Sequence, residues 1–181
     1  HRSIQEIILA YCARMYKKNQ DLKVLEEIEI SFERYLSDTL SKEDFEKMKV
    51  LADHAEAFLK HGNFLHHKIQ TRIKAELGKI YFYLGNFLKA KKNLHESFDS
   101  LNTHDPKNFS ELAPVLACLG MVYRELGDFQ KAQSLLMQSL EIYKTHLVKD
   151  YLGITQILGY LSTIYRELGN FEEAKEYLNK S

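Results

Sequence analysis

The feature that most restricts the fold of this chain is a motif that recurs at a fixed spacing. Its three copies occupy residues 80–87, 122–129 and 164–171 and read IYFYLGNF, VYRELGDF and IYRELGNF. Their glycines follow one another at intervals of 42 residues. A fixed period in this range is typical of supersecondary units stacked along one axis. The sequence therefore predicts a repeat protein.

Each copy predicts two helices joined by a tight turn. In the second copy, Leu119 and Tyr123 have the spacing of one helical face. Gly127 favours the left-handed backbone that ends a helix, and Asp128 can accept a hydrogen bond from the first free N–H groups of the next helix. Ala132 is small enough to let the two helices approach closely. We predict an all-α protein whose helices break near Gly85, Asn108, Gly127, Asp150 and Gly169.

The order of these residues resembles the tetratricopeptide repeat. Leu119-Gly120-x-x-Tyr123 followed by Gly127-Asp128-Phe129-x-x-Ala132 carries the resemblance, and the same frame fits the first and third copies. Two features depart from it. The position usually taken by tryptophan holds Lys74, Leu116 or Leu158, and the period exceeds the usual length of about 34 residues. HEAT repeats have a similar period but lack this residue order.

Long repeats of this kind resemble those of kinesin light chain and of bacterial multidomain signalling ATPases. The resemblance implies a right-handed superhelical solenoid of antiparallel helix pairs. We place three repeats in residues 63–181, at about 63–107, 108–149 and 150–181. Ser110 is expected to cap the first helix of the second repeat.

Residues 1–62 are expected to form an N-terminal helical segment. Apolar periodicity predicts helices over 3–18, 21–39 and 41–61, the last with a capping box that starts at Ser41. Residues 54–64 resemble a degenerate repeat, and a helix that starts at Asn63 or Phe64 should run on to Leu84. The first eight residues read HRSIQEII. They resemble the segment that ends the winged-helix part of NB-ARC-type signalling ATPases, which often reads like HRLVQEVI. Any amphipathic helix is the alternative.

Composition narrows the classes of partner. The chain of 181 residues carries 25 basic and 25 acidic side chains, whereas nucleic-acid binding needs a concentrated basic face. No apolar run approaches the roughly 20 residues of a membrane span. Two cysteines, Cys12 and Cys118, suggest buried thiols rather than a disulfide framework. We expect no nucleic acid, no membrane and a cytoplasmic location, and because the chain starts with His1 we expect a piece of a longer protein.

No pattern of catalytic residues is present in the sequence. The glycines do not match a phosphate-binding loop. His54, His61, His66 and His67 cluster, but a zinc site needs converging ligands of fixed geometry, no cysteine is near and Gly62 interrupts the helix. We therefore expect no enzyme activity, no metal and no cofactor.

The remaining candidate site is the groove that the resemblance assigns to the first helix of each repeat. Ala75, Ala117 and Gly159 are small residues that should open this groove, and Arg124 and Arg166 should form a ladder on successive repeats. An extended or helical peptide could bind there, with arginines on its carboxylates or carbonyls. Alternatively, these residues are ordinary helix surface. The expected groove residues are Lys79, Phe82, Tyr83, Met121, Arg124, Glu125, Gln156, Tyr160, Thr163, Arg166 and Glu167.

Two kinds of function remain open. The favoured one is a non-enzymatic module that binds a protein or peptide and serves as the sensor or regulatory arm of a larger signalling ATPase. The alternative is a free-standing adaptor that resembles the cargo-binding repeats of kinesin light chain. Tyr177 and Leu178 lie in a terminal repeat without a polar outer face, which would permit end-to-end self-association.

Overall fold

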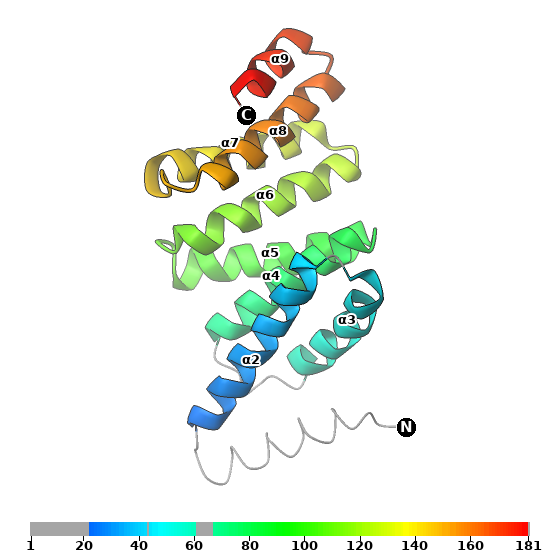
Figure 1. The fold of residues 1–181 in the computed structure, drawn as a ribbon, viewed down its shortest axis with the longest axis vertical. Helices are drawn as coiled ribbons and strands as arrows, with labels where there is room; N and C mark the ends of the chain where they lie inside the picture. The colour runs from blue at the N-terminus through cyan, green and yellow to red at the C-terminus, as the bar shows by residue number, and fades with distance from the viewer. Residues whose placement is uncertain (1–21, 43, 61–66, 181) are drawn as a thin grey trace. The chain divides into compact units, whose positions relative to one another are not determined.

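The computed structural model describes residues 22–42, 44–60 and 67–180, and within these ranges the ordered elements are all α-helices (Figure 1). The helix predicted over 3–18, the NB-ARC-like opening and the glycine turn at Gly62 lie outside the described residues. The helices are α2 (Leu22–Ser41), α3 (Phe45–Lys60), α4 (His67–Tyr83), α5 (Phe87–His104), α6 (Phe109–Glu125), α7 (Phe129–His146), α8 (Tyr151–Glu167) and α9 (Phe171–Lys180).

The helix boundaries repeat with the period of the sequence. α4, α6 and α8 each contain 17 residues, and they begin at His67, Phe109 and Tyr151, which are 42 positions apart. α5 and α7 each contain 18 residues and begin at Phe87 and Phe129. All five predicted helix breaks are confirmed.

The glycine turns have the backbone geometry that the sequence predicts. Gly127 has a φ of 81°, and its N–H donates to the carbonyl of Arg124 at 3.0 Å, while the N–H of Asp128 donates to the carbonyl of Tyr123 at 2.9 Å. These two bonds satisfy carbonyls that the end of α6 leaves free. The carboxylate of Asp128 accepts from the N–H of Lys131 at 3.0 Å and caps α7. Each turn therefore ends one helix and starts the next.

The two predicted serine caps are wrong. Ser41 belongs to the last turn of α2, where its hydroxyl donates to the carbonyl of Asp38 at 2.8 Å. Asp44 caps α3 instead, since its carboxylate accepts from the N–H of Lys47 at 3.1 Å. Ser110 lies inside α6, and its hydroxyl donates to the side-chain oxygen of Asn108 at 2.9 Å.

The chain divides into two compact units, His1–Asn86 and Phe87–Ser181. In the first unit, α4 packs against both α2 and α3. Leu36, Met48, Ala55, Ile73 and Leu77 are fully buried between these helices. The helix before the first glycine turn, α4, therefore packs against both helices that precede it in the described residues.

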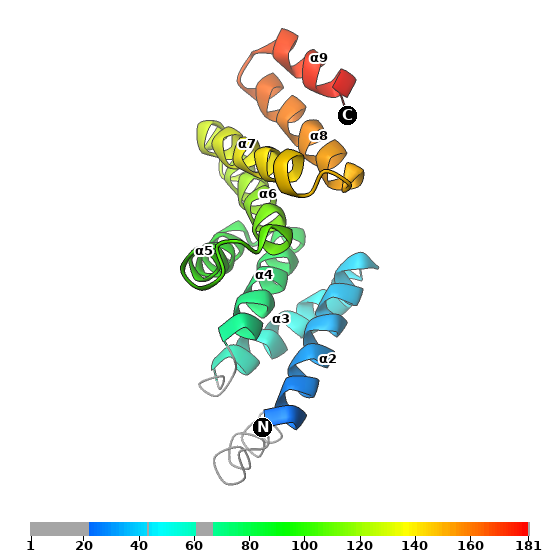
Figure 2. The ribbon, with the colours of Figure 1, turned by 90° about the vertical axis from the view of Figure 1, so that its left-hand side faces the viewer.

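In the second unit, α5 to α9 pack in sequence, each against the next (Figure 2). Ala132 is fully buried, and a Cβ added to Gly120 would lie 2.7 Å from Cγ of Leu136 and 3.2 Å from the carbonyl oxygen of Ala132. The buried hydroxyl of Ser139 donates to the carbonyl of Ala113 at 2.8 Å. Small residues thus permit the close approach of α6 and α7, and a buried hydrogen bond fixes their register.

Candidate functional site

The candidate residues of the second unit lie on two helices that contact each other, α6 and α8. Arg124 and Glu125 are the last two residues of α6, and Arg166 and Glu167 are the last two residues of α8. The two Arg-Glu pairs therefore stand at equivalent positions of successive repeats. That the two arginines form a two-step ladder stays a prediction.

The two arginines differ in how firmly they are held. Arg124 forms an ion pair with Glu125, and each of these side chains is 28% exposed. Nη2 of Arg166 lies 4.0 Å from Oε1 of Glu167, with side chains that are 65% and 45% exposed. Exposed ion pairs contribute little to stability, so Arg166 is the more available of the two for a partner.

Open space on α8 lies beside Gly159, about two helical turns before Arg166. A Cβ added to Gly159 would meet no heavy atom within 4 Å, whereas its counterpart Ala117 is buried. Thr163 is half-buried and donates its hydroxyl to the carbonyl of Gly159 at 3.1 Å. Gln156 is exposed and Tyr160 is half-buried. The open part of the α6–α8 face therefore belongs to α8.

Met121 was expected on the surface of the groove, but the structure buries it. Its side chain is buried, with 8% exposure, so a partner could not contact it without displacing other atoms.

Three expected groove residues belong to the first unit. Nζ of Lys79 lies 2.7 Å from Oε1 of Glu76, and the rings of Phe82 and Tyr83 meet edge to face at 5.8 Å. Tyr83 is 45% exposed. These three residues lie on or at the end of α4 in the first unit, whereas α6 and α8 belong to the second unit.

A polar contact between α5 and α6 involves Tyr123, the residue that precedes Arg124. Nε2 of His95 and the hydroxyl of Tyr123 lie 2.9 Å apart, and Nζ of Lys91 lies 4.7 Å from the centre of the Tyr123 ring. Burial lowers the pKa of His95, and Lys91 and Lys131 lower it further, while Asp99 acts in the opposite direction. The neutral imidazole is therefore the form that this contact favours.

This shift predicts a pH dependence of stability. Because the pKa of His95 is lower in the folded state, the unfolded chain binds the proton more tightly, and the fold loses stability as the pH falls below about 6.5, the ordinary value for histidine. Thermal unfolding measured between acid and neutral pH should show this loss, and His95→Gln should reduce it. His146→Gln is the matched control on α7. An equal pH dependence in wild type and His95→Gln would contradict the assignment.

In the part of the chain that the structure describes, neither a metal-binding cluster nor a membrane-spanning helix is found. There, no group of three or more histidine, cysteine, aspartate or glutamate side chains is placed to hold a metal ion. His61 and His66 lie outside the described residues. No helix among the described residues is long and apolar enough to cross a membrane.

The sequence matches a family model over most of the repeat region. The tetratricopeptide repeat model fits residues 70–145 and again residues 111–181, which together make up more than half of the chain. The chain belongs to the tetratricopeptide repeat family. Repeats of this family are protein-interaction scaffolds that typically bind proteins or peptides. A search of curated protein sequences finds no significant match.

Solved tetratricopeptide repeat structures share this fold at low sequence identity. Tetratricopeptide-like repeats of a putative kinesin light chain from Podospora anserina are 17% identical, with 99% of this chain and 95% of that chain covered and a TM-score of 0.64. A signal transduction ATPase with numerous domains and a tetratricopeptide repeat sensor, from Pyrococcus horikoshii, is 17% identical, with 97% and 28% covered and a TM-score of 0.66. The tetratricopeptide repeat domain of Arabidopsis FLU is 23% identical, with 64% and 93% covered and a TM-score of 0.58. The predicted all-α solenoid fold is thereby confirmed.

Exposed apolar residues also lie outside the predicted groove. Val148 and Leu152, at the turn between α7 and α8, are 54% and 69% exposed. A signal for Leu152 is present in the sequence, because the same position of the earlier repeats holds Lys68 and Ser110. A leucine at a position that is otherwise polar is not required by the repeat.

Proposed function

We propose that this tetratricopeptide repeat chain is a non-enzymatic interaction module that binds a segment of a partner protein on the α6–α8 face. The observation that supports this proposal is the open space beside Gly159 on α8, the helix that also carries the exposed Arg166. An extended or short helical segment could lie along this face. Its side chains would enter the space that Gly159 leaves.

The chemistry of the face favours a partner with carboxylates or free carbonyl oxygens. Arginine presents several N–H donors in a planar group and can bind a carboxylate through two parallel hydrogen bonds. Arg166 is 65% exposed and stands 4.0 Å from its own glutamate, so it can turn to a partner at little cost. Glu125 and Glu167 would in turn attract basic side chains and set the direction of the bound segment.

Two settings suit such a module. The favoured setting is the sensor or regulatory arm of a larger signalling ATPase, in keeping with the fold likeness to the repeat sensor of the Pyrococcus protein. The second setting is a free-standing adaptor, in keeping with the likeness to kinesin-light-chain-like repeats over nearly the whole of both chains. In either setting we propose a cytoplasmic protein whose main partner is not a nucleic acid, and whose α9 surface can associate with a second copy.

A paired reversal of charge tests the binding face. Wild-type protein and Arg124→Glu with Arg166→Glu would each be used to capture partners, and any partner recovered would be titrated against both. We expect binding to be lost in the double variant while the helices are retained. Arg166 is an exposed helix position, which tolerates such a change within about 0.5 kcal/mol, and Arg124 lies in the last turn of α6 with a partly exposed side chain. Circular dichroism would check the fold.

The control is Lys92→Glu with Lys175→Glu, two exposed lysines on α5 and α9. Lys91 is unsuitable because its ammonium group lies over the ring of Tyr123. The control should bind as wild type does. If the Arg124/Arg166 variant keeps the affinity of wild type, the α6–α8 face is not the binding site.

A further inference from the structure

The first helix of a repeat covers the second helix of the repeat before it. In the second unit, α6 packs on α5 and α8 packs on α7 (Figure 2). Leu94 of α5 and Leu136 of α7 are fully buried, whereas Leu178, at the same position of α9, is 61% exposed. Phe171 lies about two helical turns before Leu178 on the same face and is 67% exposed. Among the described residues, the apolar face of α9 therefore lacks the cover that α5 and α7 have.

The adjoining face of α8 is open in the same way. Ala113 and Ala117, four positions apart on one face of α6, are buried, and α6 contacts α8. The same positions of α8 hold Thr155, which is exposed, and Gly159, which is half-buried with open space at its Cβ position. Because α8 contacts both α6 and α7, their covered faces adjoin, and so do the counterparts on α8 and α9. We call Thr155, Gly159, Phe171 and Leu178 the end surface.

The end surface is formed without a partner, because α9 is held in place from its other side. The ring of Tyr177 stacks on that of Tyr165 of α8 at 5.0 Å, with 17° between the planes. Its hydroxyl donates to Sδ of Met137 of α7 at 3.5 Å, and Ala174 is buried. None of these contacts uses the end surface. A partner would bind a surface that is already in place, which lowers the entropy cost of binding.

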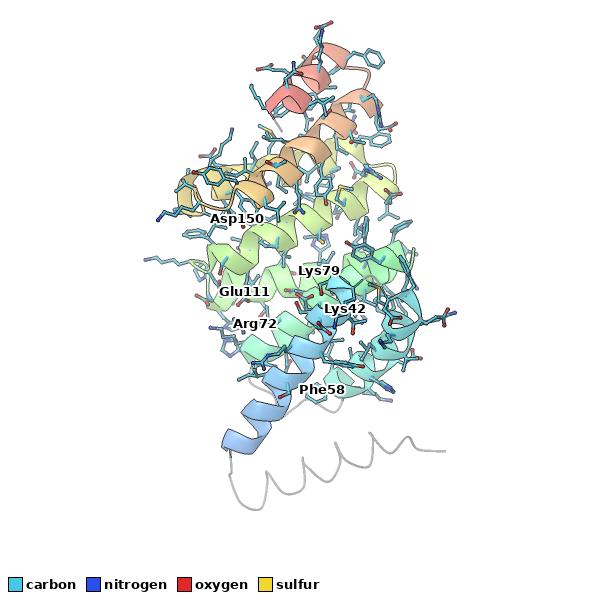
Figure 3. All side chains as sticks on the ribbon, viewed as in Figure 1. Lys42, Phe58, Arg72, Lys79, Glu111 and Asp150 are labelled. Atoms are coloured by element: carbon cyan, nitrogen blue, oxygen red, sulfur yellow. The ribbon has the colours of Figure 1, made fainter. Side chains whose placement is uncertain are left out.

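The way α8 covers α7 shows what fits such a surface. The start of α8 lies at the end of α7, since a Cβ added to Gly153 would overlap the ring of Tyr143, and the two helices therefore run antiparallel. Asp150, labelled in Figure 3, caps this start through its carboxylate, which accepts from the N–H of Gly153 at 2.9 Å. The apolar residues that α8 buries three or four positions apart are Ile157, Leu161 and Ile164. The occupant of this kind of surface is an amphipathic helix.

A second copy of this chain is less suited to the end surface than a helix of another protein. The first helices α4, α6 and α8 are each packed against neighbouring helices of their own unit. The face that a second copy would bring is that of its own α9, which contains 10 residues, whereas α8 covers α7 with a helix of 17 residues. A longer helix buries more apolar area, and the gain in free energy grows with that area.

Charge contributes little to the choice of partner. The charged residues of α9 and of the last turn of α8 are Glu172, Glu173, Glu176, Lys175, Lys180, Arg166 and Glu167. Acidic and basic side chains differ by only one among them, and Lys180 already pairs with Glu176 at 2.5 Å. The affinity of the end surface must therefore come mainly from apolar burial.

We propose that the end surface is a docking site for an amphipathic α-helix of a partner protein, in the place and direction that α8 takes on α6 and α7. Apolar residues of this helix, three or four positions apart, cover Leu178 and Phe171, and one of them enters the space beside Gly159. The site shares Gly159 with the α6–α8 face and to that extent rests on the proposed function. A second copy on α9 would compete with the helix for the same residues.

The test uses a fluorescein-labelled synthetic peptide with the sequence of residues 150–168, titrated into the full chain by fluorescence anisotropy. Leu178→Asp is expected to weaken binding by about tenfold, which corresponds to about 1.4 kcal/mol. The fold should tolerate this change because Leu178 is exposed. A peptide with proline in place of Leu161 cannot form the helix and should not bind. Added salt should change the affinity little, since the binding is apolar.

The control is Leu88→Asp on α5, where the leucine is 73% exposed, and it should bind the peptide as wild type does. The proposal is overturned if wild type does not bind the peptide, if Leu88→Asp and Leu178→Asp lose equal affinity, or if the proline peptide binds equally well. It is also overturned if Leu178→Asp changes only dimerisation seen by light scattering.

The same variants separate this site from the α6–α8 face. If Leu178→Asp binds the peptide as wild type does while Arg124→Glu with Arg166→Glu loses its captured partner, the end surface is not a docking site and the proposed function stands. If Leu178→Asp loses the peptide while the arginine variant keeps its captured partner, the end surface is supported and the α6–α8 face is not the binding site.

Discussion

Replacing Leu136 by alanine is expected to lower the free energy of unfolding by about 2–5 kcal/mol, whereas the same change at Leu178 should alter it by about 0.5 kcal/mol or less. The two leucines occupy one position of successive repeats. Leu136 is fully buried, as is Leu94 one repeat earlier, while Leu178 is 61% exposed. The expected difference arises because α8 packs on α7, and α9 has no such cover among the described residues.

Urea unfolding of both variants, followed by circular dichroism at several protein concentrations, would measure this difference. A small effect of Leu178→Ala at every concentration is the expected result. A large loss that depends on concentration would mean that a second copy covers α9 in solution, as the proposed self-association requires. Equal large losses that do not depend on concentration would contradict the exposure of Leu178.

The helical framework could be predicted from the sequence because its signals are local. Gly127 has a positive φ that favours glycine, and Asp128 follows it with a side chain that can cap the next helix. These short-range requirements recur at Gly85 and Gly169, so the period alone locates the helix boundaries. Family membership then follows from residue types at fixed positions.

The helix starts without a glycine turn were harder to predict. Around Ser41 and Ser110 several polar side chains compete for the same free N–H groups, and the sequence does not rank them. Asp44 caps α3, while Ser110 instead bonds to Asn108. Such choices depend on where the preceding helix ends, which packing decides.

The exposure of the residues on the candidate face could not be predicted from the sequence either. Met121 and Thr163 are equivalent by register, yet Met121 is buried and Thr163 is half-buried. Ala117 and Gly159 are likewise equivalent, yet the space is at Gly159. Register places residues on a face of a helix, but their exposure depends on the neighbouring helices. The contact of His95 with Tyr123 could not be foreseen for the same reason.

At the contact between the end of α7 and the start of α8, a large side chain packs against a glycine. Tyr143 is buried, and a Cβ added to Gly153 would lie 2.3 Å from Cε1 of its ring. The same two positions of the preceding repeat hold Leu101 and Glu111. A larger residue at the end of α7 is therefore accommodated by the absence of a side chain on α8.

Gly153→Ala is accordingly expected to destabilise the fold by about 1–3 kcal/mol through overpacking. Gly159→Ala, on the same helix but with open space around it, should instead stabilise by about 0.5–1 kcal/mol, since alanine is the better helix former. Adding Tyr143→Leu to Gly153→Ala should recover part of the loss, with a coupling of about 0.5–3 kcal/mol in a double-mutant cycle. Urea unfolding of the four proteins of the cycle would measure it. Additive effects of the two changes would show that the ring of Tyr143 does not occupy the space beside Gly153.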